Sequence, residues 1–295
     1  PCSGRQPCSI PAMRADGAFA VETDAGRIAG SASGQGRDLL FLHGGPGLSD
    51  YADLLRDETK AWHTVHYQQR GIAPSATTGP FTVARHVDDA IAVLDGLGIE
   101  RVVVLGHSWG GHLALQVAIA EPERVTGIVV VDGLGSTGDG GAPALGAELV
   151  RRLPAERAAR WQALAQQSEQ PGGDDEEALE SLRLLWPGYF ADPSSAPAMP
   201  ASMRISRACN EESSASAIEA MAGGAFAERL RTLALPAIVM VGEGSPMPHA
   251  VGEETASLLP RAELVRVPAA GHLVWIEQPG SVARALARVA DLAAA

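Results

Sequence analysis

Short runs of Val, Ile and Leu alternate along this chain with longer segments in which apolar residues recur every three or four positions. Continuous β-branched runs are typical of strands buried on both faces of a parallel sheet, and the second pattern is typical of helices that bury one face. The runs predict strands at residues 38–42, 63–67, 101–106, 125–131, 236–241 and 262–267. The segments between them predict helices at residues 82–96, 109–120, 249–259 and 279–293.

Residues 18–33 alternate with a period of two around a turn at residues 24–26, which predicts an opening antiparallel hairpin. The later strands alternate with helices, and this order requires right-handed crossovers. Thr82 is expected to cap the first of these helices. We therefore expect an α/β fold with a mostly parallel twisted sheet flanked by helices, whose ligands bind beyond the carboxyl ends of the strands.

Residues 133–232 interrupt this alternation. They open with a Gly-rich stretch, residues 133–141, whose composition predicts a flexible linker. Helical patterns follow at residues 146–168, 176–186 and 212–231. We expect residues 136–232 to form a helical cap that shapes the pocket and controls entry to it, although a surface decoration without substrate contacts is the alternative.

This insertion predicts the domain organisation. Residues 17–135 and 233–295 would form the core, and residues 1–16 would form a flexible N-terminal segment. The aromatic residues of the cap are candidates for an apolar pocket or for the core of the cap itself: Trp161, Trp186, Tyr189 and Phe190.

A candidate nucleophile follows the strand predicted at residues 101–106. Residues 106–110 have the sequence GHSWG, which is the pattern G-x-S-x-G between a strand and a helix. A serine at such a tight turn projects its Oγ beyond the sheet, and the flanking glycines let the neighbouring strand and helix approach. The following helix directs backbone N–H groups toward the place where negative charge develops in acyl transfer. Ser108 is therefore the predicted nucleophile.

Two backbone N–H groups are candidates for an oxyanion hole. Residues 43–47 have the sequence HGGPG and follow a predicted strand, and such a loop can turn its N–H groups toward a pocket. We expect the N–H groups of Gly45 and Trp109 to bind the oxyanion. His43 is expected to brace this loop by hydrogen bonds rather than to act in catalysis.

The predicted general base is His272. Of the eight histidines, it alone follows Ser108 on a loop beyond a late strand, at residues 262–267. A serine attacks a carbonyl only if a base takes its proton, and histidine is the usual base. A solvated loop histidine is the alternative.

With these motifs the chain resembles the α/β-hydrolases, and within that fold the proline iminopeptidase-like serine hydrolases. The resemblance covers roughly residues 17–135 and 233–293. It implies a serine hydrolase that forms an acyl-enzyme, and esterases and lactonases carry close variants of the motifs. The matching motifs are HGGPG at residues 43–47, YQQRG at 67–71, GHSWGG at 106–111, and Gly271-His272.

The sequence departs from the resembled pattern at two positions. Gln68 stands where the pattern usually has Asp. Ser245 stands where the acid of the triad usually lies, three residues after Gly242. A serine cannot stabilise an imidazolium by charge, so the third member of the triad is missing from its usual place.

A carboxylate is still expected to accept a hydrogen bond from Nδ1–H of His272 and to fix its tautomer. Asp132 is the first candidate, because it directly follows the strand at residues 125–131 and so shares the sheet edge with Ser108. Glu243 is the second candidate, because it lies at the end of the following strand. A dyad in which Ser245 or water orients the histidine is the third.

The resemblance also implies a binding site for a free amino group. In iminopeptidase-like enzymes cap glutamates bind the ammonium group of the substrate, and this cap has Glu211 and Glu212 near the start of its last predicted helix. Acids at a helix start also favour the helix dipole without any ligand, which is the structural alternative. Arg70, in the motif YQQRG, is expected to brace its loop.

Composition excludes several classes of partner. The 295 residues carry a net charge of −12, which opposes binding to the phosphates of nucleic acids. No segment predicts a signal peptide or a membrane span, so we expect a cytoplasmic protein. The cysteines Cys2, Cys8 and Cys209 fit neither a disulfide framework nor a zinc site, and we expect no cofactor and no metal. The sequence leaves the oligomeric state open.

Three functions remain open. The first is an aminopeptidase that acts on short peptides and removes a residue such as proline, which requires Glu211 or Glu212 to face Ser108. The second is a carboxylesterase or lactonase that acts on a small metabolite in an apolar pocket without a carboxylate. The third is a non-hydrolytic ligand-binding protein that kept the fold.

Overall fold

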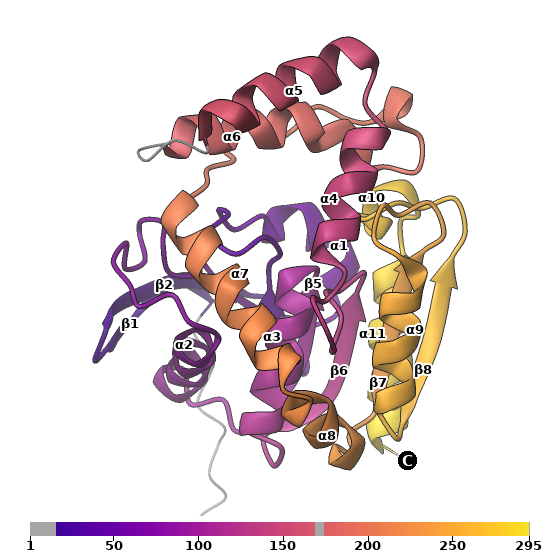
Figure 1. Ribbon diagram of the computed structural model, residues 1–295. Coiled ribbons are helices and arrows are strands. Elements are labelled where there is room, and N and C mark those ends of the chain that lie inside the picture. Colours follow the sequence, from indigo (N-terminus) through magenta and orange to yellow (C-terminus); the bar gives the residue numbers. More distant parts are fainter. Residues whose placement is uncertain (1–15, 169–173, 295) are drawn as a thin grey trace, which may run out of the picture.

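The computed structural model describes residues 16–168 and 174–294. Among these residues, eight strands form one sheet in the order β1-β2-β4-β3-β5-β6-β7-β8 (Figure 1). The pairs β1–β2 and β2–β4 are antiparallel, and the later pairs are parallel. The predicted α/β fold with a mostly parallel sheet is therefore confirmed. The strands are β1 (Gly17–Thr23), β2 (Gly26–Ser33), β3 (Asp38–Leu42), β4 (His63–Tyr67), β5 (Val102–His107), β6 (Val125–Val131), β7 (Ala237–Gly242) and β8 (Ala262–Val267).

Helices cover both faces of this sheet. Because neighbouring side chains of a strand point to opposite faces, β3 contributes to two apolar clusters. Leu40 and Leu42 pack in the cluster that contains α2 and α3, whereas Leu39 and Phe41 pack in the one that contains α11. Burial on both faces explains why the central strands β3, β5, β6 and β7 are nearly continuous apolar runs. The helices of the core are η1 (Ala52–Leu55), α1 (Arg56–Thr59), α2 (Val83–Gly96), α3 (Trp109–Ala120), α9 (His249–Leu258), α10 (Val274–Glu277) and α11 (Ser281–Ala294).

Side-chain oxygens hold the starts of two core helices. Thr82 caps α2 as expected, since its hydroxyl accepts a hydrogen bond from the N–H of Arg85. The buried carboxylate of Glu58 accepts from the N–H groups of Gly280 (2.5 Å) and Ala283 (2.8 Å) at the start of α11. A negative charge at this end of a helix also favours its dipole.

A helical region is inserted between β6 and β7, and we call its members the inserted helices. In Figure 1, α5 and α6 pack side by side above the carboxyl edge of the sheet, and α7 runs down beside α2. The side chains of Phe226 and Leu230 on α8 join the buried cluster of α2 and α3. The inserted helices are α4 (Ala142–Arg151), α5 (Ala155–Ser168), α6 (Asp175–Leu185), η2 (Trp186–Tyr189), η3 (Pro193–Ser195), α7 (Arg207–Ala222) and α8 (Ala225–Thr232).

Two predicted helices of this region have other limits. The helix expected at residues 146–168 is interrupted before Pro154, because proline lacks an N–H and disfavours helical geometry in the residue before it. The helix expected at residues 212–231 starts earlier, at Arg207, and breaks at Gly224, which has a φ of +73°. A left-handed residue of this kind ends a helix, and glycine adopts it without steric cost.

The Gly-rich stretch at residues 133–141 is tied to the core rather than open. Ser136 is fully buried, and its hydroxyl shares a hydrogen bond of 3.0 Å with that of Thr255 on α9. The N–H of Gly135 donates to the carbonyl of Gly140 and closes a turn. The composition predicted a flexible linker here, and these contacts anchor its first half.

The expected N-terminal segment, residues 1–16, lies outside the described residues except for Asp16, and so do Cys2 and Cys8. Cys209 is buried on α7. Across residues 16–168 and 174–294, no helix combines the length and the apolar character that a membrane span requires.

Candidate active site

Ser108 lies at a sharp turn between β5 and α3. Its φ of +55° and ψ of −121° are strained for a residue with a side chain. The glycines on either side are required by close contacts: a Cβ on Gly106 would lie 2.1 Å from the carbonyl oxygen of Gly110, and one on Gly110 would lie 2.0 Å from that of Leu42. The motif G-x-S-x-G thus has the strand–turn–helix setting that its spacing predicted.

His272 and Asp132 meet beside this turn. The Nδ1 of His272 lies 2.5 Å from the Oδ2 of Asp132, and both side chains are almost completely buried. Because a carboxylate only accepts hydrogen bonds, Nδ1 carries the proton and Nε2 is left as an acceptor. This is the tautomer that can take a proton from a serine hydroxyl.

Asp132 has two further donors. Its Oδ1 accepts from the N–H of Gly242 at 3.2 Å, and its Oδ2 accepts from the hydroxyl of Ser245. The Ser245 hydroxyl in turn accepts from the N–H of Met247 at 3.0 Å. The residue at the usual position of the acid thus serves as a hydrogen-bond donor to a carboxylate on the neighbouring strand.

The structure does not bring Glu243, the second candidate acid, to His272. Glu243 is exposed, and its N–H donates to the carbonyl of Val267 on β8. Asp132 is the carboxylate that contacts the imidazole, because the ends of β6 and β7 are adjacent in the sheet.

Two backbone N–H groups border the same cavity as Ser108. Gly45 has a φ of +59°, and the N–H of Trp109 is the first of α3. The first N–H groups of a helix have no partner within it. Among the described residues neither N–H has a hydrogen-bond acceptor, and both residues line the cavity. The geometry therefore permits the oxyanion role expected of them.

Hydrogen bonds brace the loop that carries Gly45. The Nε2 of His43 accepts from the N–H of Gln69, and the carbonyl of His43 accepts from the side chain of Gln69. The side-chain oxygen of Gln69 accepts from the indole N–H of Trp109 at 2.9 Å. Burial lowers the pKa of His43, which keeps it neutral as this bracing requires.

The segment of the YQQRG motif has structural contacts. The Gln68 side chain accepts from the N–H of Asp50 and donates to the carbonyl of Leu48. Arg70 is fully buried and forms a two-pronged ion pair with Asp89, with both N–O distances at 2.6 Å. Neither residue lines the cavity.

Sequence reasoning missed a pair of residues that joins the two sides of the site. The Nδ1 of His107 lies 2.6 Å from the hydroxyl of Tyr51, and its Nε2 lies 3.0 Å from the carbonyl oxygen of His272. Burial, and secondarily the charge that His272 can carry, holds the pKa of His107 well below its usual range. Neutral His107 then donates to the His272 carbonyl and accepts from Tyr51. Only its place beside Ser108 in the motif could have drawn attention to it.

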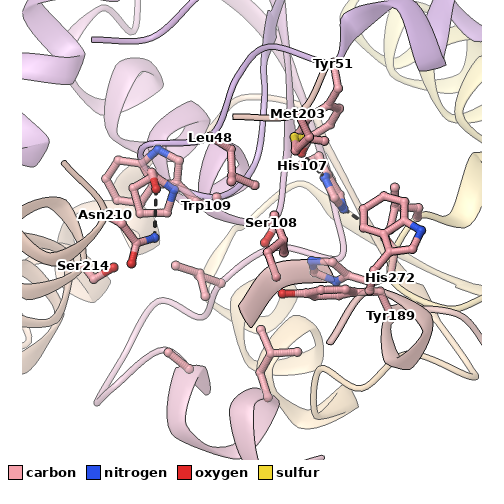
Figure 2. A pocket seen from close by; sticks show the side chains of 18 of the residues that line it. Leu48, Tyr51, His107, Ser108, Trp109, Tyr189, Met203, Asn210, Ser214 and His272 are labelled. Atoms are coloured by element: carbon pink, nitrogen blue, oxygen red, sulfur yellow. Dashed lines mark hydrogen bonds between the residues drawn. The ribbon is translucent and has the colours of Figure 1, made fainter. Parts of the chain in front are cut away.

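The cavity at this site has a volume of about 210 Å³ and is shown in Figure 2. One wall is Tyr189, whose ring stacks on His272 with a centroid distance of 5.3 Å. Most of the lining is apolar, and no Asp, Glu, Lys or Arg of the described chain takes part in it. The lining residues are Gly45, Pro46, Leu48, Tyr51, Leu54, His107, Ser108, Trp109, Leu134, Ala142, Leu145, Leu182, Trp186, Tyr189, Met203, Asn210, Ser214, His272 and Leu273.

The structure brings neither Glu211 nor Glu212 into this cavity. Glu211 is exposed and pairs with Arg207 at 2.6 Å, and Glu212 accepts from the N–H of Phe81 at 2.9 Å. Residues four apart share one face of a helix, and the face of α7 toward the cavity carries Asn210 and Ser214 instead. The expected ammonium site at these glutamates is therefore absent from the described pocket.

A family model described as the Alpha/beta hydrolase family matches residues 39–285. The chain belongs to the alpha/beta hydrolase family. This agrees with the eight-stranded sheet and with the helical insertion after β6.

Individual relatives match shorter parts of the chain. It is 36% identical over 102 residues to the putative carbamate hydrolase RutD of Caulobacter vibrioides, and this match covers 33% of this chain and 38% of that protein. It is 34% identical over 107 residues to the 2-hydroxymuconate semialdehyde hydrolase of Pseudomonas putida, and this match covers 35% of this chain and 38% of that protein. The matches therefore span well under half the length of these curated relatives.

A solved proline iminopeptidase of Mycobacterium smegmatis is similar over 94% of this chain and 100% of its own, with a TM-score of 0.64 and 22% identity. At this identity the likeness shows the fold alone. The named activities of these proteins differ, so the comparisons favour no group within the family, and the resemblance to iminopeptidases is one among several.

Proposed function

We propose that this protein is a serine hydrolase that acts on a small, uncharged carbonyl compound, an ester or a lactone. The observation that carries the proposal is the hydrogen bond between His272 and Asp132 at a cavity that also holds Ser108. A nucleophile, a base and an acid that orients the base are the parts that acyl transfer by serine requires.

In this proposal the Nε2 of His272 takes the proton of Ser108 as its Oγ attacks the carbonyl carbon. The N–H groups of Gly45 and Trp109 stabilise the oxyanion of the tetrahedral intermediate. His272 then gives its proton to the leaving alkoxide, and an ester of Ser108 remains. Water, deprotonated by His272, hydrolyses that ester. Asp132 holds the imidazole in its tautomer and stabilises the imidazolium in both halves of the reaction.

The lining of the cavity supports an uncharged substrate. A charged group buried without a partner of opposite sign is costly, and no carboxylate, guanidinium or ammonium group of the described lining faces the space. A free amino terminus would therefore lack a counter-ion here. This favours an ester or lactone over the peptide with a free amine that an aminopeptidase would cleave.

One region of the cavity is polar and lies apart from His272. Asn210 and Ser214 face it from α7 (Figure 2), and neither the Asn210 Oδ1 nor the Ser214 hydroxyl has a hydrogen-bond partner among the residues described. These groups suit a hydroxyl or an amide at the end of an apolar substrate. A volume of about 210 Å³ limits the substrate to a small one, since a cavity of about 150 Å³ holds a benzene-sized molecule.

The test compares short-chain aryl esters and small lactones with prolyl and alanyl anilides, with Ser108→Ala as the blank. We expect turnover of the esters or lactones that depends on Ser108, and little turnover of the anilides. Faster cleavage of the free-amine anilides, lost on N-acetylation, would instead indicate an aminopeptidase. If no substrate is turned over and a fluorophosphonate does not label Ser108, the non-hydrolytic alternative replaces this proposal.

A further inference from the structure

Arg152 joins the inserted helices to the core. It directly follows α4, and its side chain is only 16% exposed. The guanidinium donates to backbone carbonyl oxygens of two separate segments: those of Gly188 (3.3 Å) and Phe190 (3.3 Å), and those of Gly244 (2.8 Å) and Ser245 (2.9 Å). Its Nε also binds Glu148 at 2.8 Å.

The first of these segments supports His272. Gly188 and Phe190 flank Tyr189, whose carbonyl oxygen accepts from the N–H of His272 at 2.7 Å. The ring of Tyr189 also stacks on the imidazole. Holding the carbonyls on both sides of Tyr189 therefore fixes the backbone and the ring against which His272 rests.

The second segment supports Asp132. The hydroxyl of Ser245 donates to Asp132 at the oxygen that also binds His272. The N–H of Gly244 donates at 2.8 Å to the carbonyl of Ala270, two residues before His272. One guanidinium thus bridges the supports of the acid and of the histidine, although it contacts neither side chain.

We propose that Arg152 is a positioning residue that holds Asp132 and His272 together and so makes the alignment of the triad depend on the inserted helices. This rests on the proposed function, in which that pair serves catalysis. The planar guanidinium directs several N–H groups in fixed directions, whereas a lysine ammonium at the end of a flexible stem cannot bridge the same carbonyls. Loss of the bridge leaves these carbonyls without a donor from the described residues and lets the two segments separate.

The chain offers a matched control in Arg151. It is the preceding residue and binds the same Glu148, at 2.6 and 2.7 Å, but its side chain is 72% exposed and makes no hydrogen bond to the core among the described residues. Arg151→Ala removes the same positive charge and the same kind of ion pair. It leaves the carbonyl bridge intact.

The experiment compares wild type, Arg152→Ala, Arg152→Lys and Arg151→Ala. The readouts are the rate of Ser108 labelling by a fluorophosphonate, kcat and KM on an aryl ester, and the low-field proton resonance of the His272–Asp132 hydrogen bond. Misplacement of reacting groups by about 1 Å costs on the order of a hundredfold in rate. We therefore expect both Arg152 variants to lose roughly ten- to a hundredfold in kcat and labelling, with a smaller change in KM and a weakened or shifted resonance.

Arg151→Ala is expected to match wild type in every readout. Labelling and a resonance of wild-type character in folded Arg152→Ala would overturn the proposal, and so would equal losses in Arg151→Ala. If Arg152→Ala does not fold, Arg152→Lys decides by the same criteria. Failure of wild type to label at Ser108 refutes the proposed function instead, and the proton resonance then still tests whether Arg152 holds the pair.

Discussion

Replacement of Asp132 by Asn tests the assignment of the acid with an almost isosteric change. The N–H of Gly242 lies 3.2 Å from Oδ1 and can only donate, whereas the hydroxyl of Ser245 at Oδ2 can rotate to accept from an NH₂ group. The carbonyl oxygen of the new amide therefore stays beside Gly242, and its NH₂ group faces His272. The opposite orientation would place two donors against each other. An amide NH₂ donates to Nδ1, so the imidazole proton moves to Nε2, which then cannot accept the proton of Ser108.

The wrong tautomer in a serine triad lowers kcat by about four orders of magnitude. At about 1.4 kcal/mol for each factor of ten, this is roughly 5 kcal/mol of transition-state stabilisation. The assay is single-turnover acylation of Ser108 by an activated aryl ester, followed at pH 7 to 8. Circular dichroism and thermal unfolding establish that the variant is folded.

Two companions isolate the effect. Glu243→Gln changes the other candidate acid and is expected to keep the wild-type rate, since Glu243 does not contact His272. Ser245→Ala removes one donor to Asp132 and the acceptor of the Met247 N–H, but it leaves the hydrogen bond between His272 and Asp132 in place. It is therefore expected to cost less than about tenfold in rate. An Asp132→Asn rate within tenfold of wild type would refute the reasoning, and a large loss in Glu243→Gln would move the role of acid there.

Three further outcomes are expected. Ser108→Ala and Ser108→Gly should both abolish hydrolysis. Only the glycine variant should raise the free energy of unfolding, by about 1 kcal/mol, because glycine relieves the strained φ of +55°. Equal melting temperatures of the two variants would argue against strain. Burial lowers the pKa of His86 to about 3 and that of His112 to about 4 in the folded protein. When the pH falls below about 6.5, the usual pKa of an exposed histidine, these two residues therefore take up protons in the unfolded chain but stay neutral in the folded one. The free energy of unfolding should therefore decrease as the pH is lowered from 6.5 to 5, by about 2 kcal/mol for each histidine. A urea midpoint that does not change over this range would contradict this prediction. Glu58→Gln should lower the free energy of unfolding by about 1 to 2 kcal/mol without changing kcat, because it removes the negative charge that accepts hydrogen bonds at the start of α11. A loss of activity at unchanged stability would contradict a purely structural role of Glu58.

The parts of the fold set by local patterns could be predicted from the sequence. The runs at residues 38–42, 63–67 and 125–131 are strands with those limits, because short segments of apolar and β-branched residues favour buried strands. The helix at residues 109–120 also has its predicted limits, since the turn at Ser108 fixes where it starts. Pro154 and Gly224 were visible in the sequence, but the pattern alone gave them too little weight.

The face that α7 turns to the cavity could not be predicted. The buried positions of this helix recur every fourth residue, but two of them are Cys209 and Ser213, so no apolar stripe marks the inward side. With the start of the helix placed five residues late, Glu211 and Glu212 became candidates while Asn210 and Ser214 did not. Orientation depended on a packing partner that the sequence pattern does not show.

The candidate site divides in the same way. Residues that directly follow strands, Ser108 and Asp132, could be placed at one edge because the order of strands in such a sheet brings their ends together. Contacts between loops that lie far apart in the chain could not. The links from His107, at the end of β5, to Tyr51 and from Arg152, at the end of α4, to the carbonyls of residues 244 and 245 each end on such a loop, and no periodicity in the sequence predicts them.

Asp132 is the last residue before the insertion, and this has a consequence for exchanging insertions among members of the family. A chimaera that grafts a foreign helical region onto this core after Ser136 keeps the acid and the Ser136–Thr255 anchor. It loses the donor that Arg152 supplies and the backbone of Tyr189 on which His272 rests. The inserted helices are thus not an interchangeable module: a new specificity built by grafting has to bring its own equivalents of these two contacts.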